Sequence, residues 1–81
     1  MALLEDILYT YMDRPFMVAD GFDDAVIGVE EKTMRLVYSM DKCIDILQRR
    51  MGYLEAIEVL NMEINGRYYM NDAPIFINDT F

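Results

Sequence analysis

The spacing of the apolar residues most limits what this chain can fold into, because it changes from one stretch to the next. Residues 2–12 repeat apolar side chains at intervals of three and four, which predicts an amphipathic helix: Leu4, Ile7, Leu8 and Tyr11. That helix is expected to end at Asp13-Arg14-Pro15, since the residue before a proline avoids the helical region. Residues 25–30 and 34–38 alternate and favour strands, which predicts a β-hairpin with a short polar turn at residues 31–33.

The second half of the chain predicts two consecutive helices. Residues 40–50 place an apolar side chain every three or four positions, with Ser39 in the N-cap position. Arg49 and Arg50 would then lie at the carbonyl end of this helix and Gly52 would be its C′ residue. The next helix is expected over residues 53–62.

The C-terminal stretch allows two interpretations at Asn65-Gly66. This dipeptide either forms the turn of a hairpin that joins residues 62–64 to residues 67–70, or ends the third helix, and we favour the helix end. In both cases residues 67–70 and 74–78 are expected to be a pair of strands, with Pro74 at a strand start or a sheet edge.

Together these elements predict an α+β fold. The expected order is an N-terminal helix, a β-hairpin, two consecutive helices and a C-terminal strand pair, which form a small antiparallel sheet with helices on one face. All 81 residues are expected to be one domain. Residues 1–14 would be a separable helix and residues 24–78 the α+β core.

The charge of the chain is concentrated at one end. Residues 1–31 hold eight acidic side chains and one basic side chain, a formal charge of −7 out of a total of −8. A negative field of this kind repels phosphate and attracts basic surfaces, so it indicates a protein partner rather than a nucleic acid. We therefore predict that a host protein with a basic surface binds these partner-binding acids: Asp13, Asp20, Asp23, Asp24, Glu30 and Glu31.

Composition adds an argument for an interaction surface. Apolar residues make up 54% of a chain of only 81 residues, and eight of them are methionines. A domain this small buries a limited fraction of its surface, so part of the apolar set is expected to form a patch. That patch would serve a partner or a homo-oligomer.

Several classes of protein are excluded or disfavoured by the sequence. No apolar run approaches the roughly 20 residues that a membrane-spanning helix requires, and an acidic pair stands where a signal peptide would be basic. A single cysteine cannot form an internal disulfide, and the chain has no histidine for a zinc site of the usual kind. We expect no membrane association, no metal and no cofactor.

No catalytic residue is predicted. Ser39 and Lys42 have the Ser-x-x-Lys spacing of some acyl-enzymes, but a capping role explains Ser39 better. Cys43 has no histidine to activate it, and we expect a buried structural thiol whose pKa is raised by Asp41 and Asp45. Three acids within residues 20–24 lack the ligand spacing of a calcium loop, so a solvated acidic loop is favoured there.

Basic and aromatic residues of the sequence indicate an alternative function, the binding of a small ligand. Four side chains could cradle a nucleotide signalling molecule between protomers: Arg35, Arg67, Tyr68 and Tyr69. In that interpretation the protein is an oligomeric sponge for the nucleotide. Direct binding of nucleic acid is disfavoured by the net charge of −8.

From Asp24 onward the sequence resembles a family of small uncharacterised proteins of tailed bacteriophages. The likeness covers about residues 24–78 and rests on five short stretches: Ala25-Val-Ile-Gly28; Val37-Tyr38-Ser39 with Lys42 and Ile44-Asp-Ile-Leu47; Glu55-Ala-Ile-Glu58; Asn65-Gly-Arg-Tyr-Tyr69; and Pro74-Ile-Phe76. Family members usually carry a threonine before this proline, where the present chain has Ala73.

The resemblance implies a phage origin and a location in the cytoplasm of the infected bacterial host. Small acidic phage proteins often inhibit or redirect host machinery, including restriction and CRISPR systems. A non-enzymatic inhibitor or modulator of a host protein, with anti-CRISPR or another anti-defence activity as its sharpest form, is therefore the expected function. A nucleotide sponge and an accessory protein of the virion are the alternatives.

Overall fold

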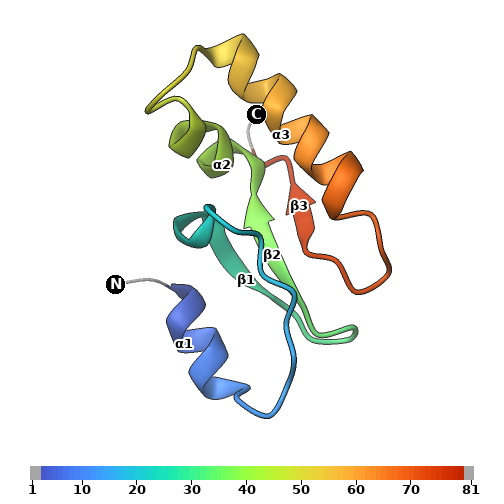
Figure 1. Cartoon of the computed structure of the whole chain (residues 1–81). Helices are drawn as coiled ribbons and strands as arrows, with labels where there is room; N and C mark the ends of the chain where they lie inside the picture. Colours follow the sequence, from blue (N-terminus) through green and yellow to red (C-terminus); the bar gives the residue numbers. More distant parts are fainter. Residues whose placement is uncertain (1–2, 80–81) are drawn as a thin grey trace.

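The computed structural model describes residues 3–79, and this part of the chain folds as three α-helices, one short 3-10 helix and three strands. The expected α+β class is confirmed. Figure 1 shows α1 beside β1 at one end of the sheet and the pair α2 and α3 at the other end. In chain order the elements are α1 (Leu3–Thr10), η1 (Asp23–Ala25), β1 (Val26–Glu30), β2 (Arg35–Ser39), α2 (Met40–Leu47), α3 (Tyr53–Arg67) and β3 (Ile75–Ile77).

The predicted hairpin is confirmed. β1 and β2 pair antiparallel, with Val29 opposite Leu36 and Glu30 opposite Arg35. The Glu30 carboxylate closes the turn, because it accepts hydrogen bonds from the backbone N–H groups of Lys32 (3.1 Å) and Thr33 (2.9 Å) and from the Thr33 hydroxyl. An irregularity in the register between residues 26 and 28 marks a β-bulge near the start of β1.

The second helix begins where it was predicted and ends early. The Ser39 hydroxyl accepts from the backbone N–H of Lys42 at 3.1 Å, so its N-cap role is confirmed. α2 stops at Leu47, which leaves Arg49 and Arg50 in the following turn. The assignment of Gly52 as a C′ residue is wrong: Gly52 has an extended backbone and is the N-cap of α3.

The third helix runs further than expected and removes one predicted strand. α3 continues through Asn65-Gly66 to Arg67, and the N–H of Tyr68 still donates to Ile64 O at 3.1 Å. The hairpin interpretation of residues 62–70 and the strand at 67–70 are therefore wrong. The main-chain bonds of those residues are used by the helix, and residues 68–74 form a loop.

The sheet is mixed rather than antiparallel. β3 lies beside β2 in parallel register, with Val37 opposite Ile75, and the strand order is β1-β2-β3. A two-helix connection returns the chain to the end of the sheet where β2 began, which makes the next strand parallel. The predicted antiparallel C-terminal strand pair is replaced by this crossover, and β3 occupies an edge.

One face of the sheet holds most of the core. Leu36 and Tyr38 are fully buried, whereas Arg35 and Val37, which alternate with them, remain partly exposed. Leu4 and Ile7 of α1 belong to the same buried cluster as Leu60 of α3. The N-terminal helix thus packs on the shared core, and whether it can separate from that core stays a prediction.

Candidate interaction site

A shallow cavity of about 300 Å³ lies between α1 and β1, and we call it the edge groove. Its helical wall consists of residues spaced by three and four, which is one face of α1. Its other wall consists of three consecutive residues of β1. The lining residues are Leu3, Asp6, Ile7 and Thr10 from α1, Tyr11 directly after it, and Ile27, Gly28 and Val29 from β1.

The consecutive residues show that the groove follows the edge of β1. Successive side chains of a strand point to opposite faces, so a cavity over one face would touch alternate residues. β1 is also the outer strand of the sheet. An added Cβ at Gly28 would meet nothing within 4 Å, which shows that there is open space over the face of the sheet to which this position points.

Acidic side chains surround this apolar groove. Asp6 lies in its wall, and the Tyr11 hydroxyl donates to the Glu31 carboxylate at 2.9 Å, which holds Glu31 near one end. This hydrogen bond raises the pKa of Tyr11. Asp23 and Asp24 form η1 directly before β1, and η1 packs against α1. Part of the acidic charge of the first third of the chain therefore lies beside an apolar surface.

The six predicted partner-binding acids do not form one cluster. Five of them are exposed, but Asp23 and Asp24 precede β1, Glu31 follows it, and Asp13 and Asp20 lie in the segment between α1 and η1. Asp20 acts elsewhere, since its charge contributes to raising the pKa of Arg67, after a hydrogen bond with Tyr68 and the charge of Glu63. Within residues 3–79 no three acidic, cysteine or histidine side chains are grouped so that they could hold a metal ion.

Glu30 has a structural role in addition to its charge. Its bonds to Thr33 and Lys32 lower its pKa, with the Thr33 hydroxyl as the largest cause. A carboxylate committed to a turn is less available to a partner. The geometry therefore supports a structural role for Glu30 in the hairpin turn.

The basic and aromatic residues of the alternative site are not drawn together around a cavity. Arg35 donates to the Thr33 hydroxyl at 3.0 Å and to Ala73 O at 3.5 Å. Arg67 pairs with Glu63 at 3.6 Å, and the Tyr68 ring packs on Phe76. Tyr69 is exposed. None of these four residues lines either of the two cavities described here.

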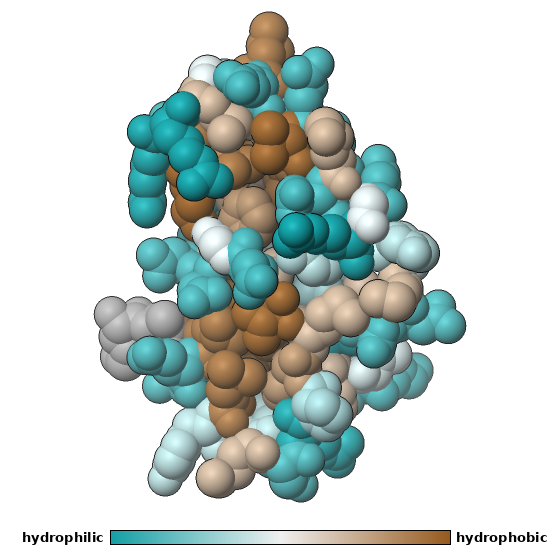
Figure 2. All heavy atoms as spheres, in the orientation of Figure 1, coloured by the Kyte–Doolittle hydropathy of each residue, from teal (hydrophilic) through white to brown (hydrophobic). Residues whose placement is uncertain are grey.

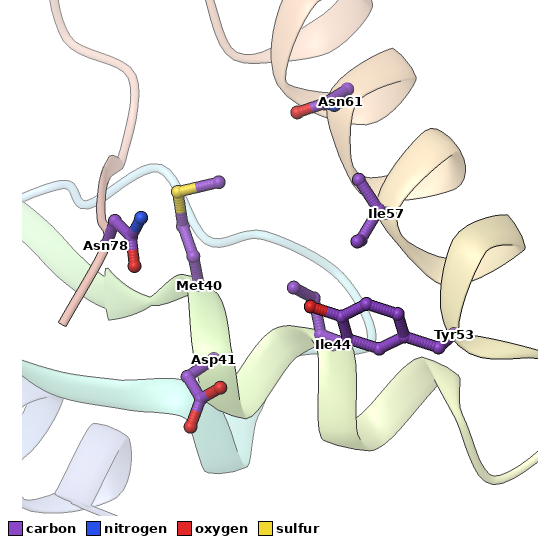
Figure 3. Close-up of a pocket in the computed structure, with 7 residues that line it drawn as sticks. All are labelled: Met40, Asp41, Ile44, Tyr53, Ile57, Asn61 and Asn78. Atoms are coloured by element: carbon purple, nitrogen blue, oxygen red, sulfur yellow. The ribbon is translucent and has the colours of Figure 1, made fainter. Parts of the chain in front are cut away.

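A second cavity of about 360 Å³ lies between α2 and α3 (Figure 3). Ile57 and Tyr53 of α3 face Ile44 and Met40 of α2, whereas Asp41 points away from α3. Met40 and Ile44 also pack against the buried core, so these side chains join the core to an open cleft between the two helices. Figure 2 shows its apolar surface as one brown area, with another over α1 and the neighbouring strands.

The candidate nucleophiles are structural. Ser39 is buried and its hydroxyl donates to the Asp79 carboxylate at 2.8 Å while it caps α2. Cys43 is buried, and burial raises the pKa of its thiol to about 12, with Asp79 adding to the shift. The expected cause of that shift, Asp41 and Asp45, is wrong, because burial and Asp79 are responsible.

Comparisons with family models, with curated proteins and with solved structures found no match. The resemblance to tailed-phage proteins therefore stays a hypothesis from the sequence. Among residues 3–79, no helix is long and apolar enough to cross a membrane.

Proposed function

We propose that this protein is a small, acidic, non-enzymatic binding protein encoded by a tailed bacteriophage. It acts in the cytoplasm of the infected host and attaches to a basic segment of a host protein, which it inhibits or modulates. The most specific version of this proposal is that the protein counters a host defence system, for example as an anti-CRISPR protein. The observation that carries the proposal is the edge groove, an apolar cleft set inside the most acidic third of the chain.

The groove and its rim supply two different contributions to binding. Leu3, Ile7 and Ile27 offer apolar area, which gives affinity once water is excluded. The surrounding acids accelerate the encounter with a basic partner and disfavour acidic ones. A surface with both properties selects an amphipathic basic segment over a purely charged or purely apolar one.

A capture experiment tests this function. The tagged protein is incubated with bacterial lysate, the bound proteins are eluted with a salt gradient, and the fractions are identified by mass spectrometry. We expect one host protein in stoichiometric amount, released as salt rises, because a charged interface weakens with ionic strength.

Two matched variants locate the binding surface. Asp6→Lys with Thr10→Lys changes exposed groove residues, and Glu58→Lys with Asn61→Lys makes the same change of charge on exposed positions of α3. The groove variant should lose the captured protein, and the α3 variant should retain it. Equal retention by both variants would contradict the proposal.

A further inference from the structure

The outer edge of β1 is unpaired within the described chain. In residues 3–79 β1 pairs with β2 alone, and its one other backbone hydrogen bond in that range runs from the N–H of Val26 to Asp23 O in η1, at the very start of the strand. An edge strand with free N–H and C=O groups is a template for another strand. Native proteins usually cover or distort such edges, and here the bulge near residue 27 affects only the first part of the strand.

The helix beside this edge leaves room along it. The edge groove is lined by Ile27 at the bulge and by Gly28 and Val29, which belong to opposite faces of the regular ladder, so it reaches around the edge of β1. Leu4 and Ile7 attach α1 to the core, and the other groove-lining residues of α1 form the outer wall. A cleft between an edge strand and a helix that runs beside it accepts an extended peptide in several domain types.

We infer that the partner segment binds in the edge groove as an added β-strand, paired through its backbone with the outer edge of β1. This inference rests on the proposed function and specifies the partner: an extended segment in which apolar and basic residues alternate. One set of side chains contacts Ile7, Ile27 and Val29. The other set carries the basic residues, which the acids around the groove attract: Asp6 lies in the α1 wall and Glu31 at the hairpin turn.

The alternation follows from the geometry of a strand. Because its side chains alternate between two faces, one face of the added strand can be apolar and the other basic. Its N–H groups alternate in the same way, so only every second one points at β1. A helical partner would instead use all of its N–H groups internally and would present apolar residues at intervals of three and four.

Backbone methylation separates these modes of binding. The probe is a capped peptide of alternating lysine and valine, long enough to cover the five residues of β1, with one isomer N-methylated at every valine and another at every lysine. Fluorescence anisotropy measures the dissociation constant of each peptide for the full chain. A third peptide of the same composition places its valines at helical spacing.

Strand addition predicts a difference between the two methylated isomers. One isomer should bind about as tightly as the unmethylated peptide, and the other should bind at least about tenfold more weakly, because it loses hydrogen bonds to β1. Amide exchange of residues 27–30 should slow when the unmethylated peptide binds. The Asp6→Lys and Thr10→Lys double variant should weaken binding, and the Glu58→Lys and Asn61→Lys variant should not.

Other outcomes overturn the inference in distinguishable ways. If both isomers bind as tightly as the unmethylated peptide, the contact is purely electrostatic. If both lose affinity equally, hydrogen bonds to the backbone of β1 do not fix the position of the peptide along the strand. If the helical peptide binds at the groove and the alternating one does not, the strand mode fails while the proposed function survives. If none of the peptides binds and no host protein is captured, the proposed function fails too.

Discussion

The two ends of the molecule are built in different ways. The crossover from β2 through α2 and α3 to β3 is fixed by buried and polar contacts together: the Tyr38 ring stacks on Phe76 at 5.2 Å, and Ser39 joins α2 to Asp79 after β3. The α1 end contributes two buried residues, Leu4 and Ile7, and one exposed hydrogen bond between Tyr11 and Glu31. The crossover holds the fold, and the α1 end displays charge and apolar surface.

This difference shows how a short chain can be stable and still present a surface that binds a partner. Acidic residues repel one another, so the exposed charges of a segment with a charge of −7 oppose folding while no partner is bound. The same segment still supplies half of the buried cluster, through Leu4, Ile7, Ala19, Phe22, Ala25 and Val26. The nearly neutral remainder, with a charge of −1, carries the crossover. The exposed acids can therefore change without loss of the core, whereas the buried residues between them cannot.

The largest expected effect is on the crossover. Leu60→Ala should lower the free energy of unfolding by about 2–5 kcal/mol, because Leu60 is almost fully buried and a cavity would remain. Urea unfolding measures this loss. The buried Cys43 thiol should also react faster in this variant than in the wild type.

The matched change at the other end is Leu4→Ala. It should speed amide exchange in α1 while leaving the reactivity of the buried Cys43 thiol close to that of the wild type. If Leu4→Ala exposes Cys43 as strongly as Leu60→Ala does, the N-terminal helix is integral to the core and the contrast between the two ends is wrong.

A smaller effect is expected from deleting a hydroxyl group in each region. Ser39→Ala removes the cap of α2 and the bond to Asp79, and should lower the free energy of unfolding by about 1–2 kcal/mol. Thr10→Ala removes a bond to Asp6 O on exposed α1 and should change stability by less than about 0.5 kcal/mol. Thermal melting of both variants gives the comparison, and equal losses would contradict it.

The hairpin turn should confer a pH dependence on stability. The pKa of Glu30 is lowered in the folded chain, so its stabilising contribution is present above its ordinary pKa of about 4.3 and is lost as the pH falls through the folded value. Glu30→Gln should therefore be less stable than the wild type at neutral pH, and the difference should shrink in acid. A difference that stays constant down to the acid limit would rule out this role of the carboxylate.

The smallest effect is expected for the bond that joins α1 to the hairpin. Tyr11→Phe removes the donor to Glu31 on an exposed surface, so the melting temperature should stay nearly unchanged. Amide exchange in α1 should become faster, because the helix loses a polar contact with the turn. Unaltered exchange would mean that Leu4 and Ile7 alone fix α1.

Sequence reasoning succeeded where a local signal was sufficient. The hairpin followed from alternation, and the N-cap at Ser39 followed from a hydroxyl placed before an apolar stripe. The favoured helix end at Asn65-Gly66 lies one residue before the end of α3 at Arg67. Sequence reasoning failed at the strand predicted over residues 67–70, which are the helix end and a loop, and at the direction of β3, whose partner is distant in the chain. The acids were recognised as a surface feature, but the apolar groove near them was missed, because five of its lining residues come from residues 3–11 and three from β1.

The sequence by itself determined the α+β class, the uneven charge and the approximate position of most elements, since each depends on neighbouring residues. Only the tertiary structure decided the parallel register of β3, the burial of Ser39 against Asp79 and the groove along β1. These features join residues far apart in the chain. Their stability comes from how whole elements pack, which local spacing does not specify.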